Sequence, residues 1–270
     1  MIANGESTSV SRVATFTVAT GRYLSYWRDM VIGADQYLFP DADIEVHVFT
    51  ERPEDASALQ GEISARCAIV AHQVGDLGWP EATLLRYALI DEVMPQTLAE
   101  VCLHLDADLM FVDEVGTELT PRSWQGGLAL VAHPGYWRGG PPVSASDLRR
   151  RIAARRHSPW GGLGTWETNK ESCAWVPWWQ RKTYVCGGVW MCRTPEFGRM
   201  VQELAERTRQ DASRDITAVW HDESHLNWYA SQAPHTVLPP DYCAVPSYAW
   251  LADIHPRIVA VDKGDWVRHP

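Results

Sequence analysis

Strand-like and helix-like segments alternate along the first 110 residues, and this alternation is the feature that most constrains the fold. Four runs of β-branched or alternating apolar residues predict strands, at residues 10–19, 44–49, 63–70 and 100–105. Two segments with apolar residues at helical spacing predict helices, at residues 23–37 and 82–93. A βαβαβ order of this kind is typical of an α/β fold with a parallel sheet of the nucleotide-binding type.

An acidic triplet, Asp106-Ala107-Asp108, follows the fourth predicted strand directly. In open α/β sheets, ligands bind at the carboxyl ends of the strands. Two carboxylates there repel each other unless a cation lies between them, and hard oxygen ligands suit Mn²⁺ or Mg²⁺. An identical triplet at residues 41–43 precedes a strand and is interpreted as a polar turn. The position of Asp106 and Asp108 therefore predicts a metal site that also takes oxygens from a nucleotide diphosphate.

The chain changes character after about residue 115. Residues 138–182 are rich in Gly, Pro, Arg and Trp and predict loops, and the chain from residue 239 onward is expected to be irregular. Before the loops we expect an apolar segment at 126–133. Between the loops and the irregular stretch we expect a strand at 183–192, interrupted by Gly187-Gly188, and helices at 195–214 and 219–231. Because no repeat or low-complexity linker separates the halves, we expect one domain with lobes at about 10–115 and 116–270.

Composition narrows the class of partner. A net charge of −10 disfavours nucleic acid, whose phosphates require a basic surface. The sequence has no run of 18 apolar residues and no basic stretch followed by an apolar one at its start, so we expect neither a membrane anchor nor a signal peptide. The six cysteines are scattered and predict reduced thiols. We therefore expect a cytoplasmic location.

The chain contains 14 tryptophans, and five of them cluster at positions 160, 166, 175, 178 and 179. An indole offers a flat apolar face and an N–H donor, so this cluster is compatible with a sugar-stacking surface. Packing of loop residues onto the core is the alternative interpretation.

The most distinctive segment is His221-Asp222-Glu223-Ser224-His225-Leu226-Asn227. Histidines four residues apart share a helix face, as in zinc proteases. The zinc-protease motif, however, requires glutamate directly after the first histidine, where this chain has Asp222. The shift to position 223 turns the glutamate by roughly 100° around the helix. The structural alternative to a functional site is a polar helix face whose histidine is hydrogen-bonded within the fold.

This HDESHLN string is unchanged from the pattern of glycosyltransferase family 6, which contains the blood-group A and B transferases and the α-1,3-galactosyltransferases. The resemblance runs from about Val18 to the last residue. It implies a GT-A type fold, in which a Rossmann-like UDP-binding half joins an acceptor-binding half in a single domain over residues 1–270. It also implies a UDP-sugar donor, a galactoside or oligosaccharide acceptor, and an acidic triplet of the metal-dependent, DxD-containing branch.

The resemblance assigns roles to individual residues. It implies that Glu223 is catalytic, and that acceptor contacts come from His133, Thr165, Trp220 and Glu223. It implies that Asp106 and Asp108 hold the metal. Donor contacts are expected from Val18, Thr20, Tyr23, Arg86, Asp106, Ala107, Asp108, Cys186, Gly187, Gly188, Asp222, Lys263 and Arg268. Lys263 and Arg268 are expected to close over the diphosphate once the donor binds.

The family retains anomeric configuration, so a UDP-α-sugar is expected to give an α-1,3 linkage to the 3-hydroxyl of a galactoside. Glu223 either forms a covalent glycosyl-enzyme or stabilises an oxocarbenium-like ion during front-face attack, and both routes stay open. The small residues Cys186-Gly187-Gly188 favour UDP-GalNAc over UDP-galactose. A UDP-galactose-specific enzyme and a non-catalytic carbohydrate-binding protein are the alternatives.

Overall fold

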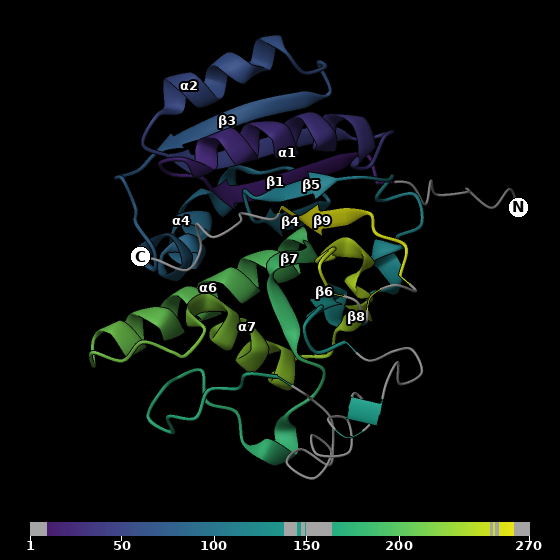
Figure 1. Ribbon diagram of the computed structural model, residues 1–270. Helices are drawn as coiled ribbons and strands as arrows, with labels where there is room; N and C mark the ends of the chain where they lie inside the picture. The colour runs from purple at the N-terminus through teal and green to yellow at the C-terminus, as the bar shows by residue number, and fades with distance from the viewer. Residues whose placement is uncertain are drawn as a thin grey trace, which may run out of the picture.

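A seven-stranded sheet forms the centre of the computed structural model, which describes residues 10–137, 145, 146, 149, 164–248, 251 and 254–261 (Figure 1). The strand order is β3-β2-β1-β4-β7-β6-β8. The strands are β1 (Arg12–Val18), β2 (Asp43–Thr50), β3 (Cys67–Gln73), β4 (Val101–Leu105), β6 (Leu128–Ala132), β7 (Val185–Arg193) and β8 (Thr236–Leu238). A separate two-stranded sheet pairs β5 (Leu109–Phe111) with β9 (Ile258–Ala260).

The first four strands of the large sheet are parallel, as the alternation predicts. β1 lies between β2 and β4, and β2 also pairs with β3. The direction then changes, because β7 is antiparallel to both β4 and β6, while β8 is parallel to β6. One continuous sheet therefore crosses from the first half of the chain into the second at the β4–β7 pair.

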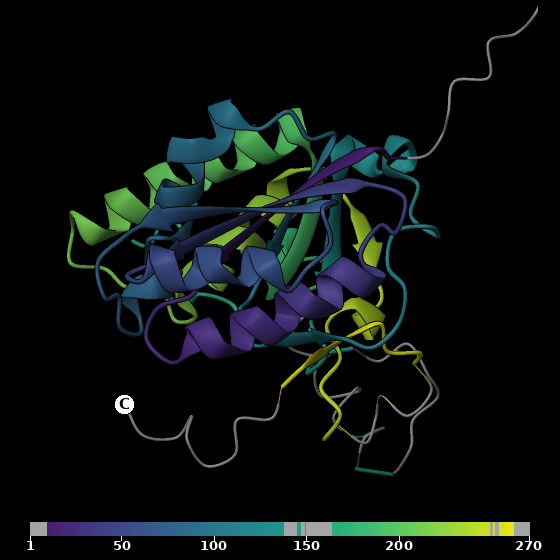
Figure 2. The same ribbon diagram turned by 90° about the horizontal axis from the view of Figure 1, so that it is seen from above.

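Helices cover both faces of this sheet (Figure 2). Seen from above, α1 (Tyr23–Tyr37) and α2 (Pro53–Ala58) lie on one side. On the other side lie α4 (Arg86–Val93) and α6 (Thr194–Ala212), and α7 (His221–Gln232) packs beside α6 (Figure 1). A short helix, α3 (Glu81–Leu84), precedes α4. The 3-10 turns are η1 (Leu59–Gly61), η2 (Met94–Gln96), η3 (Pro121–Ser123), η4 (Gln125–Gly127), η5 (Trp178–Gln180) and η6 (Pro240–Tyr242).

Each face of the sheet buries its own hydrophobic core. Under α1, the core contains Trp27, Met30 and Val31 of the helix, packed on the strand residues Val48 and Leu105. This burial follows from the helical spacing that predicts α1, whose bounds match the expected 23–37.

On the opposite face, aromatic rings stack across neighbouring strands. Phe16 of β1 lies 4.7 Å from His47 and 5.3 Å from Phe197 of α6, measured between ring centroids. Trp190 of β7 stacks on Phe197 at 4.8 Å and on His104 of β4 at 4.9 Å. This row of rings fixes α6 and β7 relative to the parallel strands, which places the end of β4 beside β7.

Several predicted elements differ from the structure. The third strand spans 67–73 rather than 63–70, because a turn precedes it, in which the Cys67 N–H donates to the Ser64 carbonyl over 3.2 Å. The Arg66 side chain in this turn donates to main-chain carbonyls at the end of α1. The helix expected at 82–93 is divided into α3 and α4 at Leu85. The last two helices begin at Thr194 and His221 instead of 195 and 219.

Three further corrections concern the second half of the chain. The strand containing Gly187-Gly188 is continuous from Val185 to Arg193, so the glycines do not interrupt it. The stretch from residue 239 is not wholly irregular, because β9 pairs with β5 directly after the acidic triplet. The triplet at 41–43, predicted as a polar turn before a strand, lies only partly in that turn: Asp41 and Ala42 are in the turn, and Asp43 is the first residue of β2. Within the described residues, no helix combines the length and apolarity needed to span a bilayer.

Candidate functional site

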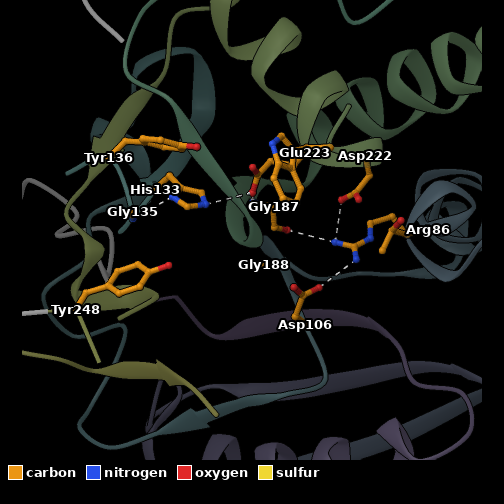
Figure 3. Close-up of a pocket in the computed structure, with 12 residues that line it drawn as sticks. Arg86, Asp106, His133, Gly135, Tyr136, Gly187, Gly188, Asp222, Glu223 and Tyr248 are labelled. Atoms are coloured by element: carbon orange, nitrogen blue, oxygen red, sulfur yellow. Dashed lines mark hydrogen bonds and ion pairs between the residues drawn. The ribbon is translucent and has the colours of Figure 1, made fainter. Parts of the chain in front are cut away.

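A pocket of about 530 Å³ opens where the carboxyl end of β4, the middle of β7 and the first turn of α7 meet (Figure 3). The sheet direction changes at this point, and such a change is where α/β folds bind ligands. The lining residues are Thr83, Arg86, Asp106, His133, Gly135, Tyr136, Gly187, Gly188, Trp220, Asp222, Glu223 and Tyr248.

Arg86 joins two carboxylates that the sequence separates by more than 100 residues. It is the first residue of α4 and is only 6% exposed. Its Nη2 lies 3.1 Å from Asp106 Oδ1, and its Nη1 lies 3.1 Å from Asp222 Oδ2. Nη1 also lies 2.8 Å from His104 Nε2 and 3.3 Å from the carbonyl oxygen of Gly187. The guanidinium therefore connects β4, β7 and α7 at the wall of the pocket (Figure 3).

The charges in this cluster follow from burial and pairing. Burial alone disfavours the charged form of Arg86, but the carboxylates of Asp222 and Asp106 raise its pKa, so it stays protonated. Burial raises the pKa of Asp222 to about 6 against the opposing effect of Arg86. Burial and the nearby Arg86 lower the pKa of His104 to about 4. Because arginine has only donors, the neutral His104 ring accepts through Nε2.

The start of α7 directs two acidic side chains at the pocket. His221, its first residue, has a φ of 46°, a left-handed conformation that is costly for histidine. The hydroxyl of Tyr87 on α4 donates to the main-chain carbonyl of Asp222 over 3.0 Å. Asp222 and Glu223 occupy the first turn, where the positive end of the helix dipole favours carboxylates.

Glu223 has the environment of a functional carboxyl group. Its Oε2 accepts a 2.8 Å hydrogen bond from the Gly187 N–H, and the Tyr184 hydroxyl also hydrogen-bonds the carboxylate. Burial raises the pKa of Glu223 to about 7, and the Gly187 and Tyr184 hydrogen bonds oppose this rise. A carboxyl group poised near neutrality in a pocket is a common property of catalytic sites.

His133 faces Glu223 from the end of β6. Its Nδ1 accepts from the Gly135 N–H over 3.0 Å, and burial lowers its pKa to about 4. The neutral ring therefore carries its proton on Nε2, which lies 3.9 Å from Glu223 Oε2. This distance exceeds a direct hydrogen bond, and an interposed hydroxyl oxygen fits the donor–acceptor pair.

The Gly187-Gly188 pair lies in a bulge of β7. Leu130 of β6 pairs with Trp190, but Ala132 pairs with Val185, so residues 186–189 of β7 have only one residue opposite them. A Cβ atom added at Gly188 would lie 2.9 Å from Asp106 Oδ2. Glycine is therefore required for β7 to approach Asp106 so closely, and the bulge aims the Gly187 N–H and carbonyl at Glu223 and Arg86.

The acidic triplet offers one carboxylate directly to the pocket. Asp106 lies at the pocket with 36% of its side chain exposed, whereas Asp108 is 9% exposed and does not line it. In the described part of the chain, no three His, Cys, Asp or Glu side chains gather as a metal cage. Carboxylate oxygens nevertheless suit Mn²⁺ or Mg²⁺ when a diphosphate supplies further oxygens. Arg86 occupies Asp106 Oδ1 in the structure and would share this oxygen with the ion.

The other sequence-predicted site residues do not line this pocket. Val18, Thr20 and Tyr23 follow the carboxyl edge of β1, and the Thr20 hydroxyl donates to the Leu77 carbonyl over 2.6 Å. The remaining described ones are Ala107, Asp108 and Cys186, which are buried, and Thr165, whose hydroxyl contacts Tyr136. Lys263 and Arg268 lie outside the described residues.

The tryptophan cluster divides between core and surface. Trp166 is buried and packs edge-on against Tyr184 at 5.1 Å between ring centroids. Trp175 is half-buried, whereas Trp178 and Trp179 are exposed. None of these four lines the pocket, and Trp160 lies outside the described residues.

Sequence reasoning missed several polar residues of the site, including Thr83 in the pocket lining. Tyr184 contacts Glu223, His104 contacts Arg86, and Tyr248 lines the pocket. His104 carries a readable signal, because it precedes Asp106 by two residues and therefore shares its face of the extended chain. Tyr184 and Tyr248 reach the site through the tertiary fold and have no local signal.

Comparison of the sequence with known proteins identifies the class of protein to which this site is similar. Residues 161–268, which include β7, α6 and α7, match the model of glycosyltransferase family 6. The chain is 26% identical over 228 residues to histo-blood group ABO system transferase 2 of Rattus norvegicus, covering 83% of this chain and 60% of the relative.

Two further relatives are similarly distant. Globoside alpha-1,3-N-acetylgalactosaminyltransferase 1 of Gallus gallus is 24% identical over 235 residues, covering 83% of this chain and 59% of the relative. Alpha-1,3-galactosyltransferase 2 of Homo sapiens is 24% identical over 253 residues, covering 91% and 66%. The chain thus spans about three fifths of the length of the ABO and globoside relatives.

The fold is of the GT-A glycosyltransferase type, with a mixed sheet in which the neighbouring strands β3, β2, β1 and β4 are parallel. The resemblance of this chain to glycosyltransferase family 6 is confirmed by the family match and by these relatives.

Proposed function

We propose that this protein is a retaining glycosyltransferase that moves GalNAc, or galactose, from a UDP-sugar to the 3-hydroxyl of a galactoside and forms an α-1,3 linkage. The observation that carries the proposal is the position of Glu223. Its carboxyl group, with a pKa of about 7, shares one pocket with Asp106, Arg86 and His133. The family match over residues 161–268 supports the reaction class.

Electrostatics support a cation in donor binding. Among the described residues that line the pocket, Arg86 brings one positive charge, while Asp106, Asp222 and Glu223 bring carboxyl groups. A nucleotide diphosphate would be repelled by this set unless a cation accompanied it. In the proposal, Asp106 and Asp108 hold Mn²⁺ or Mg²⁺, which neutralises charge on the departing diphosphate. Arg86 holds Asp106 and Asp222 in place on the donor side.

Glu223 acts on the anomeric carbon in the proposed reaction. The bond from this carbon to the diphosphate oxygen breaks, and a bond to the acceptor oxygen forms. Glu223 either attacks the carbon and forms a covalent intermediate, or stabilises the positive charge that develops there. Both routes need the ionised carboxylate, and the Gly187 N–H stabilises that form.

The acceptor is proposed to lie on the side of His133. Its Nε2 proton and the Glu223 carboxylate are 3.9 Å apart, and a sugar hydroxyl placed between them would accept from one and donate to the other. Trp220 is 49% exposed at the pocket rim and offers an indole face for a sugar ring.

The donor sugar is proposed to be GalNAc in preference to galactose. Relatives named for each sugar occur, so similarity alone favours neither. In the proposal, the absence of side chains at Gly187 and Gly188, which line the pocket, favours the larger N-acetylated sugar, because a side chain there would push Asp106 or Glu223 towards the ligand.

The decisive experiment is substitution of the candidate catalytic residue. Glu223→Gln keeps the shape of the side chain and its acceptor for the Gly187 N–H but removes the charge. We expect it to retain UDP binding in the presence of Mn²⁺ and to lose transfer by a factor on the order of 10³ or more. Transfer is measured with UDP-GalNAc and UDP-galactose against a panel of galactosides.

Glu171→Gln, at an exposed position, is the matched control and should transfer sugar like the wild type. Near wild-type turnover of Glu223→Gln would remove Glu223 from the reaction. Absence of transfer by the wild type with every donor and acceptor would overturn the proposed function itself.

A further inference from the structure

Asn227 is a buried amide, and two of its three side-chain hydrogen bonds join α7 to the start of β7 at the pocket wall. It is 1% exposed and lies one helical turn after Glu223. Its Oδ1 accepts from the Val185 N–H over 2.8 Å, and its Nδ2 donates to the Val185 carbonyl over 2.8 Å. Nδ2 also donates to the Glu223 carbonyl over 2.9 Å. The Asn227 side chain therefore bonds both main-chain groups of Val185, as a neighbouring strand would. It also binds the helical turn that carries Glu223.

The position of Val185 gives this contact a consequence for the site. Val185 is the first residue of β7 and stands immediately before the bulge that contains Gly187. Two residues further on, the Gly187 N–H donates to Glu223 Oε2 over 2.8 Å. The chain from Val185 to Gly187 and the turn from Asn227 to Glu223 thus form a closed loop of contacts. A shift of Val185 relative to α7 would alter the distance between the Gly187 N–H and the carboxylate.

We propose that Asn227 is a positioning residue for Glu223: its amide ties the start of the β7 bulge to α7 and so aligns the Glu223 carboxylate with the Gly187 N–H. This inference rests on the function proposed above. Asn227 itself touches no reacting atom.

Residue type supports the assignment. Asparagine is the shortest side chain that presents an acceptor and two donors together, and Asn227 uses them on an N–H and two carbonyls. Leucine would leave these buried main-chain groups without partners, and aspartate would leave both carbonyls facing a carboxylate. Position 227 therefore requires a side chain with both an acceptor and donors, as an amide has, and not only one of the right size.

The kinetic test compares Asn227→Ala with Ser231→Ala. Ser231 lies one turn further along α7, is buried, and donates to the Trp228 carbonyl over 2.7 Å, but this bond stays within the helix. We expect Asn227→Ala to lower kcat by a factor on the order of 10 to 100, since small misplacements of reacting groups have effects of that size. The KM for the UDP-sugar and the affinity for UDP with Mn²⁺ should stay at the level of Ser231→Ala.

A second measurement needs no transfer activity. Melting temperatures at pH 8 are compared for wild type, Asn227→Ala, Glu223→Gln and the double variant, which form a cycle. Because the ionised carboxylate depends on the Gly187 N–H more than an amide does, Glu223→Gln should raise the melting temperature more in the Asn227→Ala background than in the wild type. If Asn227→Ala does not fold, Asn227→Asp takes its place, since it keeps the size and the acceptor for Val185.

The outcomes separate the two proposals. A selective loss of kcat together with a non-additive cycle supports the positioning role. Equal kcat values for Asn227→Ala and Ser231→Ala, a parallel loss of UDP affinity, or an additive cycle would overturn it. If the wild type transfers no sugar, the proposed function fails, whereas the cycle still reports whether Asn227 positions Glu223.

Discussion

Glu223 shows at the scale of one residue how a functional carboxyl group affects stability. Burial raises its pKa from 4.5 to about 7, while the Gly187 N–H opposes the rise. The groups facing it are Asp222 on α7, Tyr184 before β7, His133 after β6 and Asp106 after β4. Because the folded protein binds this proton more tightly than the unfolded chain, stability attributable to Glu223 is highest below pH 4.5 and falls as the pH rises towards 7.

The raised pKa of Glu223 predicts that a variant without this carboxyl group loses catalytic activity but is more stable at high pH. Glu223→Gln removes the buried charge, so the variant should be more stable than the wild type at pH 8, by an amount on the order of 1–3 kcal/mol. At pH 4 the two proteins should unfold alike. Thermal unfolding at both pH values, without nucleotide, measures the difference.

The exposed Glu54 on α2 provides the control for this prediction. Glu54→Gln should change stability far less than Glu223→Gln, because an exposed carboxylate in the first turn of a helix gains only a small stabilisation from the helix dipole. A Glu223→Gln variant that is no more stable than the wild type at pH 8 would contradict the burial argument.

Single residues were predictable where their chemistry is local. Asp106 could be located because a buried strand ends before it, and Glu223 because its motif is rare. Tyr184 and the Asn227–Val185 contact could not, since each depends on two elements meeting in space. The partners of Arg86 likewise come from three different elements.

At the scale of elements, the β4–β7 pair decides how much room the donor has. The Asp106 N–H donates to the Gly188 carbonyl over 2.9 Å, so a side chain at 188 would point at the Asp106 carboxylate. Gly188→Ala should therefore slow transfer of both sugars and lower the GalNAc-to-galactose ratio by a factor on the order of 10, since the methyl group would displace the Asp106 carboxylate into the space that the N-acetyl group needs. The ratio of kcat/KM values for the two UDP-sugars tests this.

Gly61 is a suitable control, because an added Cβ there meets nothing within 4 Å. Gly61→Ala should keep the wild-type ratio. An unchanged ratio in Gly188→Ala would refute the steric basis of the donor preference, even if both rates fell.

The elements that could be predicted are those long enough to show a period. The helix at 23–37 was predicted with its bounds, because five buried side chains repeat along it. The strands β5, β8 and β9 have three residues each, too few for a pattern, and all three were missed. The third strand was misplaced because a turn closed by the Cys67 N–H and the Ser64 carbonyl precedes it, and the apolar pattern of residues 63–70 does not reveal that turn.

At the scale of the whole molecule, the sheet unites the two halves that sequence reasoning distinguished. β4 comes from the first and β7 from the second, and the pocket lies where they pair. The parallel half could be predicted from alternation. The strand at β7 was also predicted, but its antiparallel direction and its partners were not, because pairing between distant strands leaves no periodic signal.

Metal dependence is a property of the assembled site and is tested on the whole protein. We expect EDTA to abolish transfer and Mn²⁺ to restore it. Saturation with UDP should raise the melting temperature by about 5 °C or more when Mn²⁺ is present, as expected for a ligand at roughly 100 times its Kd. Without the ion, repulsion from the three carboxyl groups should largely remove this shift.

The same melting experiment compares the variants Asp106→Asn and Asp222→Asn. Only the first changes a proposed metal ligand, so only the first should lose the Mn²⁺-dependent part of the UDP shift. Full transfer activity in EDTA would refute metal dependence while leaving the role of Glu223 intact.

The β5–β9 ribbon couples the acidic triplet to a segment about 150 residues further along the chain. The Val261 N–H donates to the Asp108 carbonyl over 2.9 Å, which continues the ribbon pairing into the triplet itself. The backbone of one proposed metal ligand is therefore held from outside its own lobe. Local opening of β9 would release Asp108 before it released the parallel strands, so the ribbon is where the affinity for an ion could be changed without touching the large sheet.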